Sequence, residues 1–480
     1  MPASENPPKR LIVPGAENEP PPGAAPRIVL PGPEPPDAGD AQRAEPAETP
    51  EEPRGASRIV LPPGVSRPAG DDIPEYPKLR PLILMPVGDG EREMLLVQDP
   101  LGVVPGQPVL GLESLALLQL FDGTASITDI TAILMRENKD LRMANMVRDF
   151  VARLDELLML DSPRFQSAYR ELRDAYHALE IRQAAFDGRS YPADPEALRR
   201  FLDGHFAEAE QWRATEAPPP PVPAPRALMA PHLDPRRAGP LLARSFLELD
   251  PAAAAREPLR VVVFGTGHSL MSDLYALTRK HFETPLGKVE CDLAFVDAVA
   301  VPLGDAAYHS ELVHRDEHSI EFQAVYLRHR LGDRAKIVPI LCGGFHALLD
   351  EGLTPRDSAE FEALIQSVRD AERRLGGRTV YVAAVDLSHV GPRFGDPAPD
   401  ERTRAEVEAF DREALEAARL SDADAWFQAI AAHDDATRIC GFAPTYAMLR
   451  CAEPGPGRQL RYLKSDEKDG SFVSVASMAW

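Results

Sequence analysis

The sequence has few cysteines, a shortage of positive charge and no long apolar run. Its 480 residues include four scattered cysteines, Cys291, Cys342, Cys440 and Cys451, which are too few for a disulfide framework. A net charge of -22 argues against a nucleic-acid backbone or an anionic membrane as the main partner. The first residues lack the apolar stretch of a secretory signal, and no run reaches the roughly 18 apolar residues of a membrane helix. These absences predict a cytoplasmic protein with no nucleic-acid and no membrane partner.

Proline, by contrast, is abundant and concentrated at the start of the chain. Nineteen of the 49 prolines precede Glu75, and a segment this poor in apolar residues cannot offset its chain entropy by burial. We therefore predict a disordered tail over residues 1–74. This segment contains three similar short sequences: RLIVPG, RIVLPG and RIVLPPG, at residues 10–15, 27–32 and 58–64. They indicate either composition bias or a short multivalent motif that adds a strand to the sheet edge of a partner or of this protein.

Residues 75–165 form the first predicted domain. Two strands around a Gly-Asp-Gly turn precede three amphipathic helices, which is typical of a small winged-helix-like α+β domain. The stretch LLQLFDGTASITDITAILM, residues 117–135, resembles the helix–turn–helix of PqqD-like peptide-binding domains. The acidic charge balance favours protein interaction over DNA binding.

Residues 180–480 alternate strands and helices. Four nearly continuous apolar runs end in polar residues: RALMAPH (226–232), LRVVVFGTGH (259–268), AKIVPILCGG (335–344) and RTVYVAAVDLSH (378–389). Strands buried on both faces predict an α/β fold with a central, mostly parallel sheet flanked by helices. We expect the polyproline run at residues 217–225 to be a loop inside this domain.

Polar side chains end three of these runs. His232 ends the first, His268 the second, and Asp386 and His389 the fourth. Ligands gather at the carboxyl ends of parallel strands, and imidazole and carboxylate suit divalent transition metals. Cys440, followed by Gly441, is a candidate fifth member. The pattern predicts one shared polar site; the alternative is that each histidine bonds a backbone carbonyl at its own strand end.

A second cluster competes with this site. His314 and His318 are four residues apart and Glu321 follows three later, so that on a helix they share one face and have spacing suited to zinc. The alternative, which we favour for this cluster, is a solvated, charged rim of a helix.

Eight motifs in residues 180–480 resemble the Memo family, which includes AmmeMemoRadiSam system protein B. Along the chain they are FDGRSYPADPEALRRFL, APHLDPRRAG, GTGH, TPLGKVECD, EHSIEFQ, VPILCGG, VDLSHVG and RICGFAP. The Memo fold is similar to that of the class III extradiol dioxygenases, which hold Fe(II). The resemblance implies partners as well: a radical SAM protein and an AMMECR1-domain protein of the same system.

The resemblance also implies roles for five residues. His232, His268 and Cys440 match the family's metal positions, for Fe(II) or Cu, or else Zn, while Asp386 and His389 match residues that line the same pocket. The dioxygenases use two histidines and a carboxylate, whereas Cys440 supplies a thiol, and Asp234 adds a carboxylate where the family has PHAGY.

Three functions stay open at this point. The first is a metal-dependent oxidoreductase with His389 as general acid/base, oriented by Asp386. The second is a metal-free catalyst with Cys440 as nucleophile, His389 as base and Asp386 as its orienter. The third is a non-catalytic module that binds a peptide or protein partner.

Deleting residues 1–74 is expected to leave the melting temperature nearly unchanged, because the composition of this tail predicts no buried core. Differential scanning calorimetry of the full chain and the truncated chain is the measurement. A loss of several degrees would mean that a copy of the repeat docks on the folded part.

Overall fold

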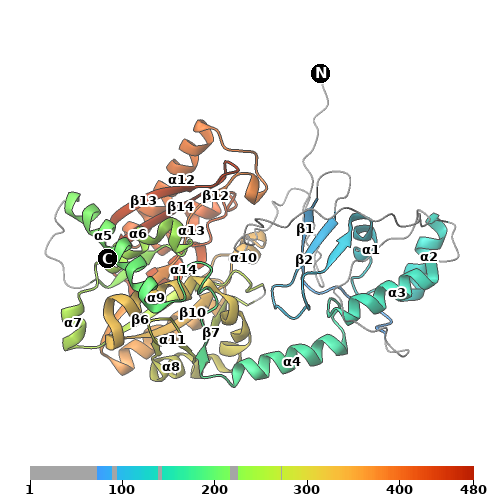
Figure 1. Ribbon diagram of the computed structural model, residues 1–480, viewed down its shortest axis with the longest axis horizontal. Coiled ribbons are helices and arrows are strands. Elements are labelled where there is room, and N and C mark those ends of the chain that lie inside the picture. Colours follow the sequence, from blue (N-terminus) through green and yellow to red (C-terminus); the bar gives the residue numbers. More distant parts are fainter. Residues whose placement is uncertain (1–72, 89–93, 139–142, 217–224, 272) are drawn as a thin grey trace, which may run out of the picture. The chain divides into compact units, whose positions relative to one another are not determined.

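The computed structural model describes residues 73–480 except 89–93, 139–142, 217–224 and 272 (Figure 1). Nearly all of the tail for which disorder is predicted, and nearly all of the polyproline run, therefore lie outside the described residues. The chain separates into two compact units, the first ending at Ala175 and the second spanning Tyr176–Trp480. No helix of the described residues is long and apolar enough to cross a membrane.

The first unit has the predicted order of strands before helices. Its antiparallel sheet runs β1 (Ile83–Val87), β2 (Met94–Gln98) and β3 (Val109–Gly111). The helices that follow are α1 (Leu115–Leu118), α2 (Ile127–Asn138), α3 (Met143–Glu156) and α4 (Pro163–His177), the last of which continues into the second unit. Alternate residues of β2 and one face of α3 share a single apolar core, because strand period two and helix period 3.6 each turn one face inward.

The second unit is built on a nine-stranded mixed sheet with a parallel centre. Four parallel neighbours form that centre, in the order β5 (Ala227–Ala230), β11 (Arg378–Ala384), β6 (Leu259–Thr266) and β10 (Ala335–Cys342). The strands outside it include β12 (His389–Val390), β14 (Phe472–Ala479) and β13 (Arg458–Asp466) beyond β5, and β7 (Tyr275–Leu277) and β9 (Glu290–Cys291) beside β10. The small parallel pair β4 (Ile181–Arg182) and β8 (His281–Phe282) stands apart from the sheet. The predicted α/β class is confirmed.

Helices cover both faces of this sheet, which explains why its central strands are apolar throughout. In β6, Val262 and Phe264 face one core and Val261 and Val263 face the other. The first core receives α8 (Leu293–Leu303), α11 (Ala359–Leu375), α12 (Glu401–Arg419), α13 (Ala423–Ala431) and α14 (Phe442–Ala452). The second receives α5 (Pro195–Thr215), α6 (Pro235–Phe246), α7 (Pro251–Arg256) and α9 (His318–Leu331). The short α10 (His346–Asp350) follows β10.

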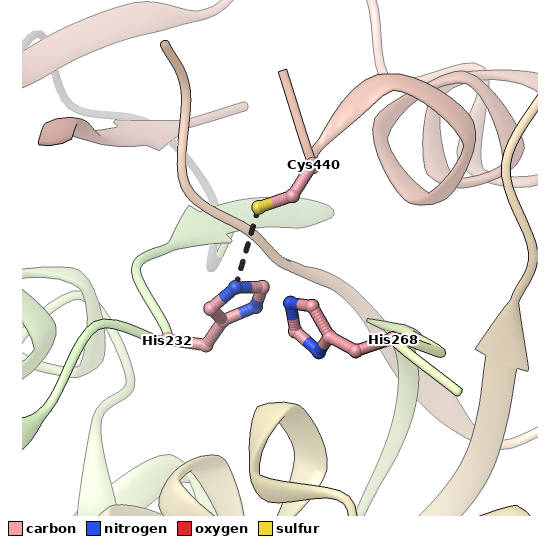
Figure 2. A group of neighbouring side chains, drawn as sticks. All are labelled: His232, His268 and Cys440. Carbon is pink, nitrogen blue, oxygen red and sulfur yellow. Dashed lines mark hydrogen bonds between the residues drawn. The ribbon is translucent and has the colours of Figure 1, made fainter. Parts of the chain in front are cut away.

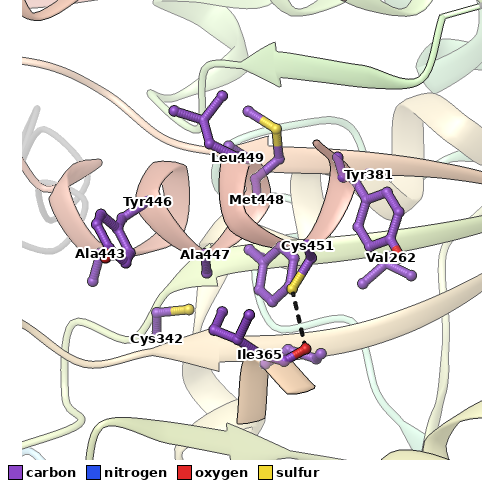
Figure 3. Close-up of a cluster of buried hydrophobic side chains, with 14 of the residues drawn as sticks. Val262, Cys342, Ile365, Tyr381, Ala443, Tyr446, Ala447, Met448, Leu449 and Cys451 are labelled. Carbon is purple, nitrogen blue, oxygen red and sulfur yellow. Dashed lines mark hydrogen bonds between the residues drawn. The ribbon is translucent and has the colours of Figure 1, made fainter. Parts of the chain in front are cut away.

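Three of the four cysteines belong to the core. Figure 3 shows Cys342 and Cys451 among the apolar side chains where α14 packs against the sheet, and Cys291 is buried in the same core. Burial raises the pKa of all three thiols, so they stay protonated and inert. Cys440 differs, because it is only partly buried and comes just before α14.

A buried ion pair joins the start of the second unit to α9. The Arg182 guanidinium contacts the Glu321 carboxylate, and both side chains are almost completely inaccessible to solvent. Arg182 also donates to the carbonyls of His314 and Glu317 at 2.9 Å. Glu321 in turn accepts the Tyr191 hydroxyl and two backbone N–H groups of residues 185 and 186. Each charge is thereby surrounded by partners, which offsets the cost of burying it.

Replacing Arg182 by Met should lower the free energy of unfolding by about 3–5 kcal/mol, since the Glu321 charge would stay buried without its partner. The double variant R182M/E321M should recover much of the loss. Urea denaturation followed by tryptophan fluorescence is the measurement, because all three tryptophans lie in this unit: Trp212, Trp426 and Trp480.

The matched control is Arg402→Ala, which removes an exposed arginine paired with Glu406 on α12 and should cost less than about 1 kcal/mol. Equal losses for the buried and the exposed arginine would show that the buried pair does not hold the unit together.

Candidate metal centre

The carboxyl ends of three adjacent parallel strands bring the predicted residues together. His232 lies two residues beyond β5, His268 two beyond β6, and Asp386 two beyond β11. Since β5, β11 and β6 are neighbours, these side chains emerge at one edge of the sheet. Cys440 reaches the same edge from the turn that precedes α14.

Three groups of potential ligand atoms occur among the described residues, and two of them contain Cys440. The first contains His232, His268 and Cys440, shown in Figure 2, and the second contains Asp386, His389 and Cys440. Within each group the ligand atoms all lie within 4.8 Å of one another. The closest approach that the first group shows is 3.3 Å, from the Cys440 Sγ to the His232 Nε2. The third group contains His268, Glu317 and His318, so Cys440 and His268 each belong to two of the groups.

Each imidazole is fixed by an acceptor on its Nδ1 side. The His232 Nδ1 donates to the Ala384 carbonyl at 2.9 Å, and the His268 Nδ1 lies 3.0 and 3.1 Å from the two Glu317 oxygens. The His389 Nδ1 donates to the carbonyls of Leu387 and Arg438, at 2.8 and 3.0 Å. Carbonyl oxygens only accept, so the Nδ1 of His232 and of His389 must carry a proton and their Nε2 atoms are free to act as bases.

Two of those Nε2 atoms are buried without any partner among the described residues, those of His268 and His389. A buried polar group left unpaired costs roughly 1–3 kcal/mol. Two such atoms at one site, beside a thiol, therefore indicate a position built to receive a ligand.

Asp386 binds the backbone that follows β5 with one carboxylate oxygen and faces His232 with the other. Its Oδ1 accepts the backbone N–H groups of His232 and Leu233, at 3.0 and 3.1 Å, and its Oδ2 lies 3.6 Å from the His232 Nε2. The carboxylate thus neighbours His232, whereas the Nδ1 of His389 is bound by carbonyls. Asp234 stays outside the site and caps the start of α6 by accepting the Arg236 N–H.

Glu317 and His318 belong to the site as well, although the strand-end pattern did not predict them. Glu317 accepts a hydrogen bond from the backbone N–H of His268 and lies within hydrogen-bond distance of the His268 imidazole. It also accepts the Ser319 N–H in the first turn of α9. The His318 ring lies 4.8 Å from that of His268 and 5.1 Å from that of His232, centroid to centroid. The signal available in the sequence was an acidic residue directly before a helical segment, where one oxygen caps the helix and the other can bind a neighbouring group.

The competing cluster does not form, and neither reading of it was right. His314 is buried and donates through Nε2 to the Ala276 carbonyl, while Glu321 is occupied by Arg182. The α9 face expected to be a solvated rim is packed in the interior. His318 joins the strand-end residues because α9 begins at the same edge of the sheet.

Burial and the Glu317 carboxylate act in opposite directions on the imidazoles of the site. Burial lowers the pKa of His232 and of His318, and it lowers that of His389 to about 4. Burial also acts to lower the pKa of His268, but the charge and hydrogen bonds of Glu317 outweigh it and the pKa is raised. The pKa of Glu317 stays well below its usual range in spite of burial, mainly because of His268 and His318. Glu317 is therefore ionised and stabilises a positive charge on His268, the one imidazole of these four whose pKa is raised.

This donor set fits a transition metal. Two imidazole Nε2 atoms and a thiol suit iron, copper or zinc, whereas magnesium and calcium prefer oxygen ligands. Burial and the Asp386 charge raise the pKa of Cys440, so the free thiol is protonated; a metal would be expected to deprotonate it. The Nδ1 of His232 binds the Ala384 carbonyl and the Nδ1 of His268 binds the Glu317 carboxylate. Such partners on the far ring nitrogen are of the kind that orient metal-bound histidines.

Comparison with known proteins identifies relatives of the second unit. A family model described as Memo-like protein matches residues 182–479. A MEMO1 family protein of Aquifex aeolicus is 27% identical over 378 residues, covering 78% of this chain and 90% of the relative. One of Methanopyrus kandleri is 28% identical over 304 residues, 62% of this chain and 97% of the relative. The Aquifex match is longer than the second unit, so its similarity extends into the first.

Replacing Glu317 by Gln in the metal-free protein should lower the pKa of His268, because the charge that raises it is removed while burial remains. The measurement is an NMR titration of the histidine imidazoles, with His268 assigned by substitution. Glu406→Gln, an exposed carboxylate on α12, is the control and should leave His268 unchanged. An unaltered pKa of His268 in the Glu317 variant would contradict the electrostatic role assigned to that carboxylate.

Proposed function

The chain belongs to the Memo-like protein family, and on that premise we propose that it is a metal-dependent oxidoreductase. Its site binds iron or copper through the Nε2 of His232, the Nε2 of His268 and the Sγ of Cys440. The observation that carries this proposal is the common orientation of the imidazoles. Each Nδ1 is taken by an acceptor, and each Nε2 is left to face the thiol or the space beside it.

A reactive metal ion is preferred to a structural zinc ion because the site keeps groups beyond the three proposed ligands. His389 and Asp386 lie next to Cys440, where they could serve a reacting molecule, whereas a structural zinc site is closed by four protein ligands. When bound, iron or copper would supply electron transfer and an open position for a small ligand such as dioxygen.

His389 is the acid/base group of this proposal. Its Nε2 is a free base at neutral pH, since burial keeps the pKa near 4, and it lies in the group that contains Cys440. It can therefore accept a hydrogen bond from a bound molecule, and a bound cation or anion that changes its surroundings would set how readily it takes the proton. Asp386 fixes the loop that carries His232 through two backbone N–H groups, so its main task is to hold the ligand rather than to orient His389.

A metal-free cysteine catalyst is the second candidate, favoured by one contact. The Cys440 Sγ lies 3.3 Å from the His232 Nε2, a nucleophile and base within reach of each other. In that case the base is His232 and not His389 as expected from the sequence. The raised pKa of Cys440 speaks against it, because a catalytic thiol needs a lowered pKa. The partners that the family resemblance implies, a radical SAM protein and an AMMECR1-domain protein, stay a prediction.

The protein purified without oxygen should carry one iron or copper ion per chain, measured by elemental analysis. His232→Ala, His268→Ala and Cys440→Ser should each abolish metal retention while keeping the circular dichroism spectrum, because the three side chains lie at the sheet edge. The controls are His309→Ala, at an exposed histidine, and Cys291→Ala, at a core cysteine, and both should retain the metal.

Zinc alone in the purified protein, with no exchange for iron or copper on reconstitution, would contradict the redox proposal. Absence of every metal, together with rapid alkylation of Cys440 near neutral pH, would favour the cysteine catalyst. Absence of both would leave a module that binds a partner.

A further inference from the structure

A strained turn leads into Cys440, and one buried arginine stands in it. Asp434, Asp435 and Arg438 all have positive φ, at 50°, 47° and 59°. Asp tolerates this region, but a long side chain such as Arg does so at a cost of roughly 1–2 kcal/mol. Arg438 must therefore make contacts that offset the strain, and its side chain is buried.

The guanidinium of Arg438 is clamped to the segment after β12. Its NH1 and NH2 groups bind the two oxygens of Asp396 at 2.6 and 2.7 Å, the paired geometry that gives the strongest ion pairs. NH1 also donates to the His389 carbonyl at 3.3 Å. This clamp fixes the side chain of Arg438 relative to His389.

The backbone of the turn holds His389 from the other side. The His389 N–H donates to the Thr437 carbonyl at 2.7 Å. Its Nδ1 donates both to the Arg438 carbonyl at 3.0 Å and to the carbonyl of Leu387 at 2.8 Å, so Arg438 supplies one of two acceptors. The left-handed conformation of Arg438 accompanies this placement of its carbonyl beside the imidazole. His389 thus contacts residues 437 and 438 through its N–H, its carbonyl and its ring.

We propose that Arg438 is a positioning residue: its clamp to Asp396 keeps the Arg438 carbonyl on the His389 Nδ1, so that the unprotonated Nε2 faces the site. The importance of the His389 Nε2 rests on the proposed function, but the tautomer of the His389 imidazole does not depend on a metal. The same turn presents Cys440 two residues later, so one clamp aligns the acid/base group and the thiol.

The test is the tautomer of His389 in the metal-free protein, read from the ¹⁵N chemical shifts of its imidazole and assigned with His389→Gln. The wild-type protein should show the Nδ1–H form, the reverse of the form that a free histidine side chain favours in water. Arg438→Ala and Asp396→Asn should each lower the ratio of the Nδ1–H form to the Nε2–H form by roughly fivefold, the worth of one net hydrogen bond. A residue that is only structural would lower the melting temperature and leave this ratio unchanged.

Arg438→Gly separates the side chain from the backbone, because glycine accepts the left-handed conformation without strain. It should also lose the Nδ1–H preference. If only Arg438→Ala loses it, the guanidinium clamp is not the cause and the proposal is overturned. Arg393→Ala is the matched control: it removes an arginine of the same segment that pairs with Glu467, and it should keep the wild-type ratio.

An unchanged ratio in Arg438→Ala and Asp396→Asn would also overturn the proposal, whatever metal the site binds. Should Arg438→Ala fail to fold, Asp396→Asn decides alone, since it weakens the clamp and leaves the turn intact. Absence of iron and copper from the wild-type protein, together with the expected loss of the Nδ1–H form in Arg438→Ala and Asp396→Asn, would overturn only the proposed function. A metal-loaded wild-type protein with an unchanged tautomer ratio in those variants would overturn only the positioning role of Arg438.

Discussion

The buried pair of Arg182 and Glu321 is the constraint on which the candidate site depends. Removing two charges from water costs several kcal/mol for each, and only a full set of partners makes the arrangement tolerable. Arg182 finds one of those partners in the carbonyl of Glu317. This residue caps the start of α9, and its carboxylate holds His268. The position of an imidazole at the sheet edge is thereby tied to the entry of the chain into the second unit, through side chains that no longer reach solvent.

The strand-end residues could be predicted because their signal is local. An apolar run that ends in His or Asp identifies a central strand and its last residue, and parallel neighbours place such residues together. His232, His268 and Asp386 follow this logic directly. Glu317 and His318 do not, since they reach the site from a helix whose position is decided by the long-range contacts of Arg182 and Glu321. The i, i+4 spacing that seemed to join His314, His318 and Glu321 failed for the same reason: His314 precedes α9 in a separate helical turn, and Glu321 faces Arg182.

The contacts and roles of the individual site residues were harder to predict than the list of residues that form the site. His389 was expected to be oriented by Asp386, three residues away, yet its Nδ1 reaches carbonyls at residues 387 and 438. Beyond a strand the side chains no longer alternate regularly, so sequence spacing says little about which groups touch. Cys440 was likewise paired with His389, whereas its nearest imidazole is that of His232. Backbone acceptors, which are invisible in a sequence, decide the tautomers and therefore the direction of each lone pair.

The contact between His232 and Cys440 spans 208 residues of chain. Contacts this distant in sequence form late in folding, because the loop that they close is ordered only when the intervening elements have packed. The ligand atoms therefore converge only when the sheet, with its central strands and the turn before α14, is nearly complete. During synthesis His232 and His268 leave the ribosome long before Cys440 does, so the nascent chain presents these imidazoles without the thiol. The metal of the proposed site would therefore enter after translation, as a step of maturation of the folded protein.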